Sequence, residues 1–386
     1  MAIAHDSAGP GHGVSRRPLF DIWPRLEHHV GFWTFGDFPT PVEPLAGLAP
    51  ALSGAGQHCY VKRDDLSSGV YGGNKVRTLE PLLGQARRAG RGRVFATGAY
   101  GSNHAVATVL HAQKLGLTAG ALLFPQPFSV AAEQNLAVCL ERADELIDLW
   151  HWSALPFAMW SVARRERRNR QSTLIMPPGG ASPRGCLGFL SAALELGEQV
   201  QQGLLPAPKE VVLALGSTCS TAGLLVGLRL GARLGIGWAL ESLPLLVAVR
   251  VTPWPVTSRY RILNLAARTA SWLARLSGER IFEISRAELS AGLELDGRQI
   301  GRGYGHPTSA GRSAIDNLGS LASALDTTYA AKSAAGLIER LRGRPDCPRV
   351  YWSTKSSRAL PEVSLEALEA APERMRRWLS QGTQES

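Results

Sequence analysis

An alternation of short apolar runs and longer helical patterns most constrains the fold of this chain of 386 residues. Apolar runs typical of buried strands lie at 93–98, 118–124, 174–176, 211–215 and 245–251. Helical patterns separate these runs and lie at 103–115, 131–141, 188–202 and 221–230. Strands and helices that alternate at this spacing predict parallel βαβ units, and therefore α/β sheets whose faces are covered by helices.

A glycine turn that ends in a lysine follows the strand-like run at 58–63. The Gly-Gly-Asn sequence at 72–74 can fold sharply, and the apolar spacing at 76–83 predicts a helix directly after Lys75. Only six of the 42 basic residues are lysines, and a lysine, unlike an arginine, offers an amine that can lose its proton and form an imine. We interpret Lys75 as the chemical centre, although this stretch alone fits a surface lysine in a turn equally well.

A polar loop follows the first predicted strand, at the edge where open α/β sheets usually bind ligands. It places Ser102, Asn103 and His104 at a helix start, where free backbone N–H groups point towards an anion. A simple helix cap by Ser102 or Asn103 is the alternative interpretation.

Two further loops of small residues follow later strands. The loop at 215–224 carries hydroxyl groups before a helix, which favours a phosphate-binding loop over a plain turn. It matches neither the Walker P-loop nor the dinucleotide-binding fingerprint. The loop at 177–185 has a similar composition and would line the same cleft.

The composition, with 45% hydrophobic and 19% charged residues, is that of an ordinary globular protein. A net charge of +10 raises the question of nucleic-acid or membrane partners, but the arginines are spread along the chain without an aromatic-basic motif, so we expect no specific nucleic acid and no membrane as partner. The densest basic run, at 164–170, is typical of a solvated helix end, and the arginine-rich segment 254–280 predicts an outer helix.

Cysteine usage and the N-terminal residues indicate a cytoplasmic protein. The five cysteines are odd in number and contain no Cys-x-x-Cys pair, so we expect reduced thiols and not a disulfide framework or a zinc site. The nine histidines show no His-x-x-x-His spacing, and no metal is expected. Residues 1–17 lack the apolar core of a signal peptide, and residues 1 to about 20 are expected to be disordered or loosely attached.

Together these motifs resemble the 1-aminocyclopropane-1-carboxylate deaminase and D-cysteine desulfhydrase family, whose members bind pyridoxal 5′-phosphate and have the tryptophan synthase β-like fold, called fold type II. The resemblance runs from about Phe38 to Ser356 and depends on Lys-Arg-Asp-Asp-Leu at 62–66, Gly-Gly-Asn-Lys at 72–75 and Ser-Asn-His at 102–104.

For the architecture, the resemblance implies a homodimer whose subunits contain two three-layer α/β domains with mainly parallel sheets. Residues 1–75 and 172–386 would form the large cofactor-binding domain, and residues 76–171 the small domain.

The resemblance also assigns roles to single residues. Lys75 would form the internal imine with the cofactor and move the substrate α-proton, and Asn103 would hydrogen-bond the cofactor ring hydroxyl. Ser102, as a catalytic and substrate-binding residue, and His104 would flank the substrate carboxylate or the reacting carbon. The residues that would hold the phosphate are Gly216, Ser217, Thr218, Cys219, Ser220 and Thr221.

The remaining matches include departures that affect the reaction. Tyr304 and Tyr329 match two catalytic tyrosines of the family. Ala330 stands where deaminases have glutamate and desulfhydrases threonine, which argues against opening of the cyclopropane ring. Thr354 keeps a hydroxyl for the cofactor ring nitrogen, although Lys355-Ser356 replaces the usual Gly-Gly pair. A neutral partner at the ring nitrogen weakens the cofactor as an electron sink, and this favours β-elimination of a good leaving group.

We therefore expect a pyridoxal-phosphate-dependent lyase or deaminase that acts on a small amino acid, similar to D-cysteine, by α,β-elimination to an oxoacid and ammonia. Other outcomes on the same scaffold stay open: racemisation, β-replacement, and deamination of 1-aminocyclopropane-1-carboxylate. A catalytically inactive member that still binds the cofactor is a further alternative.

Overall fold

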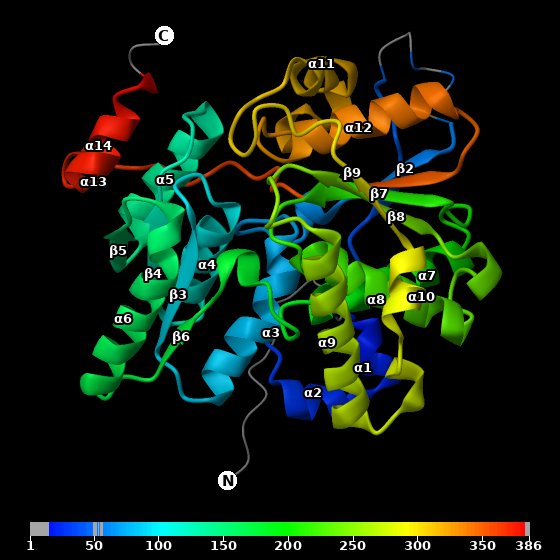
Figure 1. The fold of residues 1–386 in the computed structure, drawn as a ribbon, viewed down its shortest axis with the longest axis horizontal. Helices are drawn as coiled ribbons and strands as arrows, with labels where there is room; N and C mark the ends of the chain where they lie inside the picture. The colour runs from blue at the N-terminus through cyan, green and yellow to red at the C-terminus, as the bar shows by residue number, and fades with distance from the viewer. Residues whose placement is uncertain (1–14, 49–51, 53, 55–56, 383–386) are drawn as a thin grey trace.

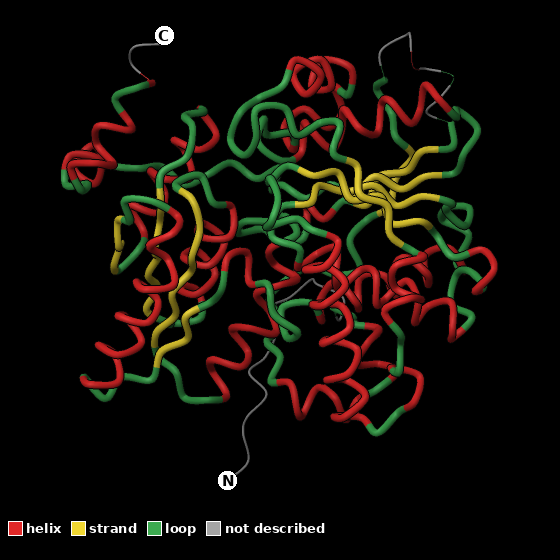
Figure 2. The backbone as a smooth tube through the Cα atoms, in the orientation of Figure 1, coloured by secondary structure: helices red, strands yellow, loops and turns green. Residues whose placement is uncertain are grey.

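Two separate sheets with mainly parallel strands organise the molecule. The computed structural model describes residues 15–48, 52, 54 and 57–382. Figure 1 shows each sheet with helices packed on it, and Figure 2 shows loop segments between the two groups of strands. This arrangement confirms the predicted α/β class with mainly parallel sheets.

The larger sheet has six strands in the order β1-β2-β10-β7-β8-β9. Their bounds are β1 Val42–Pro44, β2 Cys59–Lys62, β7 Glu210–Leu215, β8 Leu245–Arg250, β9 Leu293–Asp296 and β10 Arg349–Trp352. Only the pair β1 and β2 is antiparallel, and Val350 in β10 lies opposite Tyr60 on one side and Val211 on the other. The long inner strand β7 is buried along its whole length, because helices cover both faces.

Successive residues of these strands pack into different cores. Val211 and Leu213 contact one core, whereas Val212 between them contacts the opposite one, as the two-residue period of a strand requires. The helices of the first core are α1 Pro18–Ile22, α2 Pro24–Val30, α7 Leu187–Gln201, α8 Cys219–Leu234, α9 Arg259–Ser277 and α10 Arg286–Ala291. The helices of the second core are α11 Ser309–Asn317 and α12 Ala330–Gly343.

The smaller sheet has four parallel strands in the order β5-β4-β3-β6. Their bounds are β3 Arg93–Ala99, β4 Thr118–Phe124, β5 Glu145–Asp148 and β6 Thr173–Ile175. One face packs on α3 Lys75–Arg88, α4 Asn103–Lys114 and α5 Val130–Arg142, and the other on α6 Leu155–Arg168. The basic run 164–170 lies at the end of α6, and its arginines are exposed as expected. Arg165 is exposed too, but it forms an ion pair with Glu145.

Segments far along the chain also join the small sheet. Strand β6 pairs with β3, the C-terminal helix α13 Leu365–Glu369 packs beside α5, and Trp378 of α14 Glu373–Leu379 contacts Tyr100 edge-on. These segments lie in 172–386, which the sequence-based division places in the large domain. That division stays a prediction.

The expected disorder of residues 1–20 is wrong for residues 15–20. Helix α1 begins at Pro18, Leu19 is fully buried, and its backbone N–H donates to Ser191 Oγ at 3.3 Å. Residues 1–14 lie outside the described residues. In the part of the chain that the structure describes, no helix is both long and apolar enough to cross a membrane.

Candidate active site

The glycine turn before Lys75 is held by the ends of two neighbouring strands of the large sheet. Gly73 has a φ of 90°, and a Cβ atom there would lie 2.8 Å from the Thr354 carbonyl oxygen, so only glycine fits. The Gly73 N–H donates to Asp64 O at 2.8 Å, and the Asn74 N–H donates to Thr354 O at 2.9 Å. The turn therefore fixes Lys75 as the first residue of α3.

The Lys75 amine lies where two of the predicted loops meet. A Cβ atom on Gly179 would lie 3.8 Å from Lys75 Nζ and 2.1 Å from Ser217 Oγ. Burial lowers the pKa of the Lys75 ammonium, and the neighbouring Cys219 partly opposes this shift. Within the described ranges, no residue forms a hydrogen bond or ion pair with the Lys75 side chain. A lysine with a lowered pKa and no partner is suited to attack a carbonyl carbon.

Asn103 is oriented by two donors that the sequence did not indicate. Its Oδ1 accepts hydrogen bonds from Tyr71 Oη at 3.0 Å and from Asn135 Nδ2 at 2.8 Å. Both bonds occupy the oxygen, so the Asn103 Nδ2 group is left to donate to another molecule. Ser102 caps α4, since the Ala105 N–H donates to its Oγ at 3.2 Å. The cap interpretation of Ser102 is thus confirmed, whereas its catalytic role stays a prediction.

His104 is buried beside Lys75 without a hydrogen-bond partner on either ring nitrogen, among the residues described. Burial lowers the pKa of His104 to about 3, and the charge of Lys75 acts in the same direction. Its ring also faces Gly180, where a Cβ atom would lie 3.4 Å from His104 Cε1. A neutral imidazole with two unused nitrogens is costly to bury, and this indicates a ligand that would satisfy them.

The loop after β7 has the backbone shape of a glycine loop. Thr218 is the N-cap of α8 and has a φ of 73°, a left-handed conformation that favours glycine. The first turn of α8 presents N–H groups with no intrahelical partner, which suits a phosphate. Ser220 Oγ accepts from Asn74 Nδ2 at 3.1 Å, which ties this loop to the glycine turn. The Cys219 thiol instead donates to Gly180 O at 3.5 Å, so Cys219 offers a ligand its backbone N–H and not its side chain.

The two predicted tyrosines lie in contact next to this loop. Tyr304 Oη and Tyr329 Oη are 2.5 Å apart, and the rings pack edge to face. A Cβ atom on Gly216 would lie 2.8 Å from Tyr329 Cε1, so the Tyr329 ring covers the start of the phosphate loop. Burial raises the pKa of Tyr304 to about 12 and also raises the pKa of Tyr329. Both phenols therefore keep their protons at neutral pH.

The segment after β10 explains one departure from the family pattern. Ser356 Oγ accepts a hydrogen bond from the Gly72 N–H at 3.0 Å, and Lys355 forms an antiparallel β-bridge with Gly73. Lys355 and Ser356 therefore hold the glycine turn in place. Thr354 is buried, and the hydroxyl of the adjacent Ser353 is buried without a partner among the described residues. Hydroxyl groups therefore remain at this strand end for a bound group.

This arrangement fits pyridoxal phosphate, which needs an amine, an anion-binding loop, a donor for the ring hydroxyl and a polar partner for the ring nitrogen. A family model described as pyridoxal-phosphate dependent enzyme matches residues 34–349. The chain belongs to this family. It is therefore a pyridoxal-phosphate-dependent lyase or deaminase, as the sequence predicted.

The chain is similar along most of its length to two D-cysteine desulfhydrases and to one solved deaminase homologue. D-cysteine desulfhydrase from Salmonella paratyphi C (strain RKS4594) is 32% identical over 331 residues, which cover 83% of this chain and 93% of the relative. D-cysteine desulfhydrase from Salmonella typhimurium (strain LT2) is 31% identical over 347 residues, or 88% of this chain and 95% of the relative. A solved ACC deaminase homologue is 26% identical, with a TM-score of 0.69 and coverage of 89% of this chain and 95% of that structure.

More distant structures agree on the fold alone. Threonine deaminase isoform 2 from Solanum lycopersicum is 16% identical, with a TM-score of 0.54 and coverage of 94% of each chain. These comparisons confirm the expected pyridoxal-phosphate fold type II.

A buried ionic network behind the family site was missed by the sequence interpretation. Arg77 donates to Asp64 at 2.7 and 2.8 Å and to Glu195 at 3.0 Å, while Lys62 Nζ donates to Glu195 Oε1 at 2.5 Å. Burial alone would raise the pKa of Glu195, but Arg77 and Lys62 outweigh it and lower the pKa to about 2. The two cations and two anions of the network balance in charge. Their hydrogen bonds join β2, α3 and α7 around the turn that carries Lys75. Charged residues within otherwise apolar runs were the signal that could have revealed it.

Proposed function

We propose that the enzyme eliminates the β-substituent of a small amino acid similar to D-cysteine, and that water hydrolyses the resulting enamine to an oxoacid and ammonia. The observation that carries the proposal is the unpartnered amine of Lys75, with its lowered pKa, beside a loop shaped to hold a phosphate. The similarity to D-cysteine desulfhydrases over most of the chain supports this substrate class.

The predicted cofactor-binding residues would hold pyridoxal phosphate at four points. When bound, the cofactor supplies an electron sink for the pair left by loss of the substrate α-proton. Asn103 Nδ2 would donate to the ring hydroxyl, because two donors already occupy its oxygen. The N–H groups and hydroxyls at 216–221 would hold the phosphate, and the Thr354 hydroxyl would pair with the ring nitrogen. Lys75 would provide the covalent attachment.

The reaction then needs a base and an acid. Lys75 Nζ would remove the α-proton, because burial lowers its pKa towards the range in which an amine accepts a proton. Ser102 and His104 would bind the substrate carboxylate, and the neutral His104 ring can donate from one nitrogen. The protonated phenols of Tyr304 and Tyr329 would donate a proton to the sulfur as the bond from the β-carbon to sulfur breaks.

Ring opening of 1-aminocyclopropane-1-carboxylate is not favoured. Ala330 stands where deaminases of the family have glutamate, and the Ala330 side chain is fully buried at the start of α12. Its carbonyl oxygen accepts from Tyr351 Oη at 3.0 Å, so the position serves packing and backbone bonding. No carboxylate is available at this position for the extra proton transfer.

A substrate panel tests the proposed function. Purified holoenzyme is incubated with D-cysteine, L-cysteine, D-serine and 1-aminocyclopropane-1-carboxylate, and the oxoacid, ammonia and sulfide are measured separately. The proposal expects pyruvate, sulfide and ammonia in equal amounts from D-cysteine, with little product from the cyclopropane compound. Racemised substrate without pyruvate would instead indicate the racemase alternative, and an unchanged cofactor spectrum with all four compounds would indicate an inactive cofactor-binding member.

We also propose that the enzyme works in the cytoplasm as a homodimer. The dimer is what the family resemblance implies, and five free thiols favour a reducing compartment. Light scattering coupled to gel filtration checks the assembly: twice the monomer mass supports the dimer, and the monomer mass contradicts it.

A further inference from the structure

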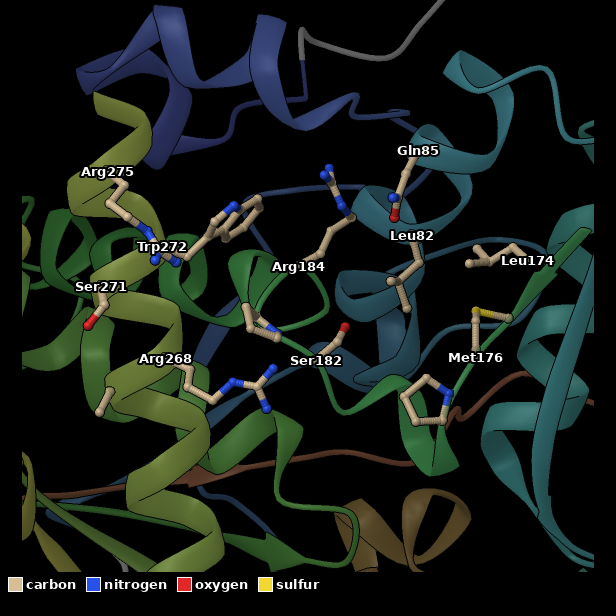
Figure 3. Close-up of a pocket in the computed structure, with 13 residues that line it drawn as sticks. Leu82, Gln85, Leu174, Met176, Ser182, Arg184, Arg268, Ser271, Trp272 and Arg275 are labelled. Carbon is tan, nitrogen blue, oxygen red and sulfur yellow. The ribbon is translucent and has the colours of Figure 1, made fainter. Parts of the chain in front are cut away.

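An arginine-lined cavity of about 740 Å³ lies between α9, α3 and the segment from β6 to Arg184 (Figure 3). Helix α9 places Arg268, Trp272 and Arg275 at positions i, i+4 and i+7, which share one face of a helix. Arg184 reaches the same space from the loop before α7. In Figure 3 these side chains surround an open space whose opposite wall carries Leu82 and Met176.

The cavity carries an excess of positive charge. Arg184, Arg268 and Arg275 line it, and none of its lining residues is acidic. Across the described part of the chain, none of these three arginines forms an ion pair. Nη1 of Arg184 is buried without a hydrogen-bond partner in the same described residues, although its guanidinium lies 5.2 Å from the centre of the Trp272 ring.

The position of Arg184 makes this excess costly. Burial lowers the pKa of Arg184 to about 10, and repulsion from Arg88 acts in the same direction. A guanidinium that is partly withdrawn from water and has no counter-charge destabilises the protein unless a ligand supplies the negative charge.

Size and chemistry indicate the kind of ligand. Cavities of roughly 300–1,000 Å³ bind small molecules, and the concave shape favours such a ligand over a nucleic acid or a membrane surface. Guanidinium groups bind phosphate and carboxylate through paired hydrogen bonds. The apolar wall, which includes Leu82, Leu174 and Met176, offers contact for an organic body.

We propose that this cavity binds a small organic molecule that carries two or more phosphate or carboxylate groups. The site is distinct from the candidate active site, because neither Lys75 nor the loop at 216–221 lines the cavity. The two are neighbours, however: Pro177 and Ser182 line the cavity and flank the short helix Pro178–Gly180, whose Gly179 lies against Lys75.

Calorimetric titration of the holoenzyme tests the proposal. Pyrophosphate and citrate are the probes, and acetate is the single-charge comparison. Bound cofactor occupies the phosphate loop, and an unchanged cofactor absorbance during titration shows that no probe displaces it. We expect saturable binding of pyrophosphate, citrate or both, and binding of acetate at least roughly tenfold weaker, because one charge meets fewer guanidinium groups. Binding of pyrophosphate alone assigns a phosphate ligand, and binding of citrate alone a polycarboxylate.

Variants on one helix supply the control. Arg268 and Arg275 are exposed, so the double variant R268Q/R275Q should fold normally, and R261Q changes an exposed arginine of α9 outside the cavity. We expect the double variant to weaken probe binding by roughly tenfold or more and R261Q to leave it unchanged. Absence of saturable binding, equal binding of acetate, or equal binding by wild type and double variant would overturn the proposal.

Discussion

Tyr304 Oη and Tyr329 Oη share a hydrogen bond of 2.5 Å beside the phosphate loop. Burial holds the pKa of Tyr304 at about 12, so this pair can donate a proton at neutral pH but cannot act as a base there. We expect Y304F and Y329F each to lower kcat/KM for D-cysteine by roughly 10²-fold or more, as loss of a general acid does. Y260F, a change at an exposed tyrosine, is the control. Full activity in both site variants would show that neither phenol takes part in proton transfer.

Thr218 adopts a backbone conformation suited to glycine. The left-handed conformation costs a residue with a side chain about 1–2 kcal/mol. Glycine avoids this cost, but its greater entropy in the unfolded chain cancels about 0.4–1 kcal/mol of the gain. We therefore expect T218G to raise the free energy of unfolding of the apoenzyme by about 0.5–1 kcal/mol. If the Thr218 hydroxyl binds the phosphate, the same variant should bind the cofactor more weakly. Urea unfolding and cofactor titration measure the two effects, and a destabilised apoenzyme would contradict the strain.

The buried network of Arg77, Asp64, Glu195 and Lys62 should be highly sensitive to loss of one member. R77M leaves two buried carboxylates facing one lysine, and we expect it to lower the free energy of unfolding by about 3–5 kcal/mol. The exposed pair Arg377 and Glu373 supplies a matched control, since solvent screens this pair and R377Q should leave the free energy of unfolding almost unchanged. Equal, small effects in urea unfolding would mean that the network does not contribute.

Two buried histidines should make the protein less stable as the pH falls. Burial lowers the pKa of His111 from 6.5 to about 4, although its hydrogen bond with the Tyr71 carbonyl opposes the shift. Between these values the unfolded chain binds a proton that the native protein does not, so stability falls as pH falls, by up to about 1.4 kcal/mol per pH unit. His104 adds a change of the same sign down to about pH 3.

H111Q keeps a donor for the Tyr71 carbonyl and removes the titration. We expect its unfolding free energy, measured in urea at pH 7.5, 6 and 5, to decline less steeply than that of the wild type. Parallel pH profiles for the two proteins would show that His111 titrates normally in the folded state.

Apolar runs were predicted well from sequence, including the short runs that form β2 and β6, whereas β5, β9 and β10 were not predicted. The run at 118–124 agrees with the bounds of β4, and α3 begins at Lys75, one residue before the predicted helix. Strand β10 has only four residues and begins with the buried Arg349, which pairs with Glu210 of β7. A charge that is neutralised by a distant strand cannot be recognised as buried in a linear pattern.

The same distinction holds in the candidate site. The local sequence indicated Lys75 and Asn103 because turns and helix starts are local features. Tyr71 and Asn135, which orient the Asn103 amide, depend on how α3, α4 and α5 pack, and no short motif marks them. The shape of the loop at Thr218 was likewise hidden, because a threonine in a sequence does not indicate a left-handed backbone conformation.

The most direct test of the central claim is the visible absorbance of the cofactor in wild type, K75A and K209A, recorded before and after addition of D-cysteine. Lys209 is exposed and precedes β7, whereas the phosphate loop follows the other end of that strand, so K209A controls for loss of a lysine. We predict that wild type and K209A show the lysine-bound cofactor band, change it on addition of D-cysteine and release sulfide, whereas K75A shows neither the band nor turnover. A K75A protein that retains the wild-type band and sulfide release would contradict the assignment of Lys75 as the catalytic lysine.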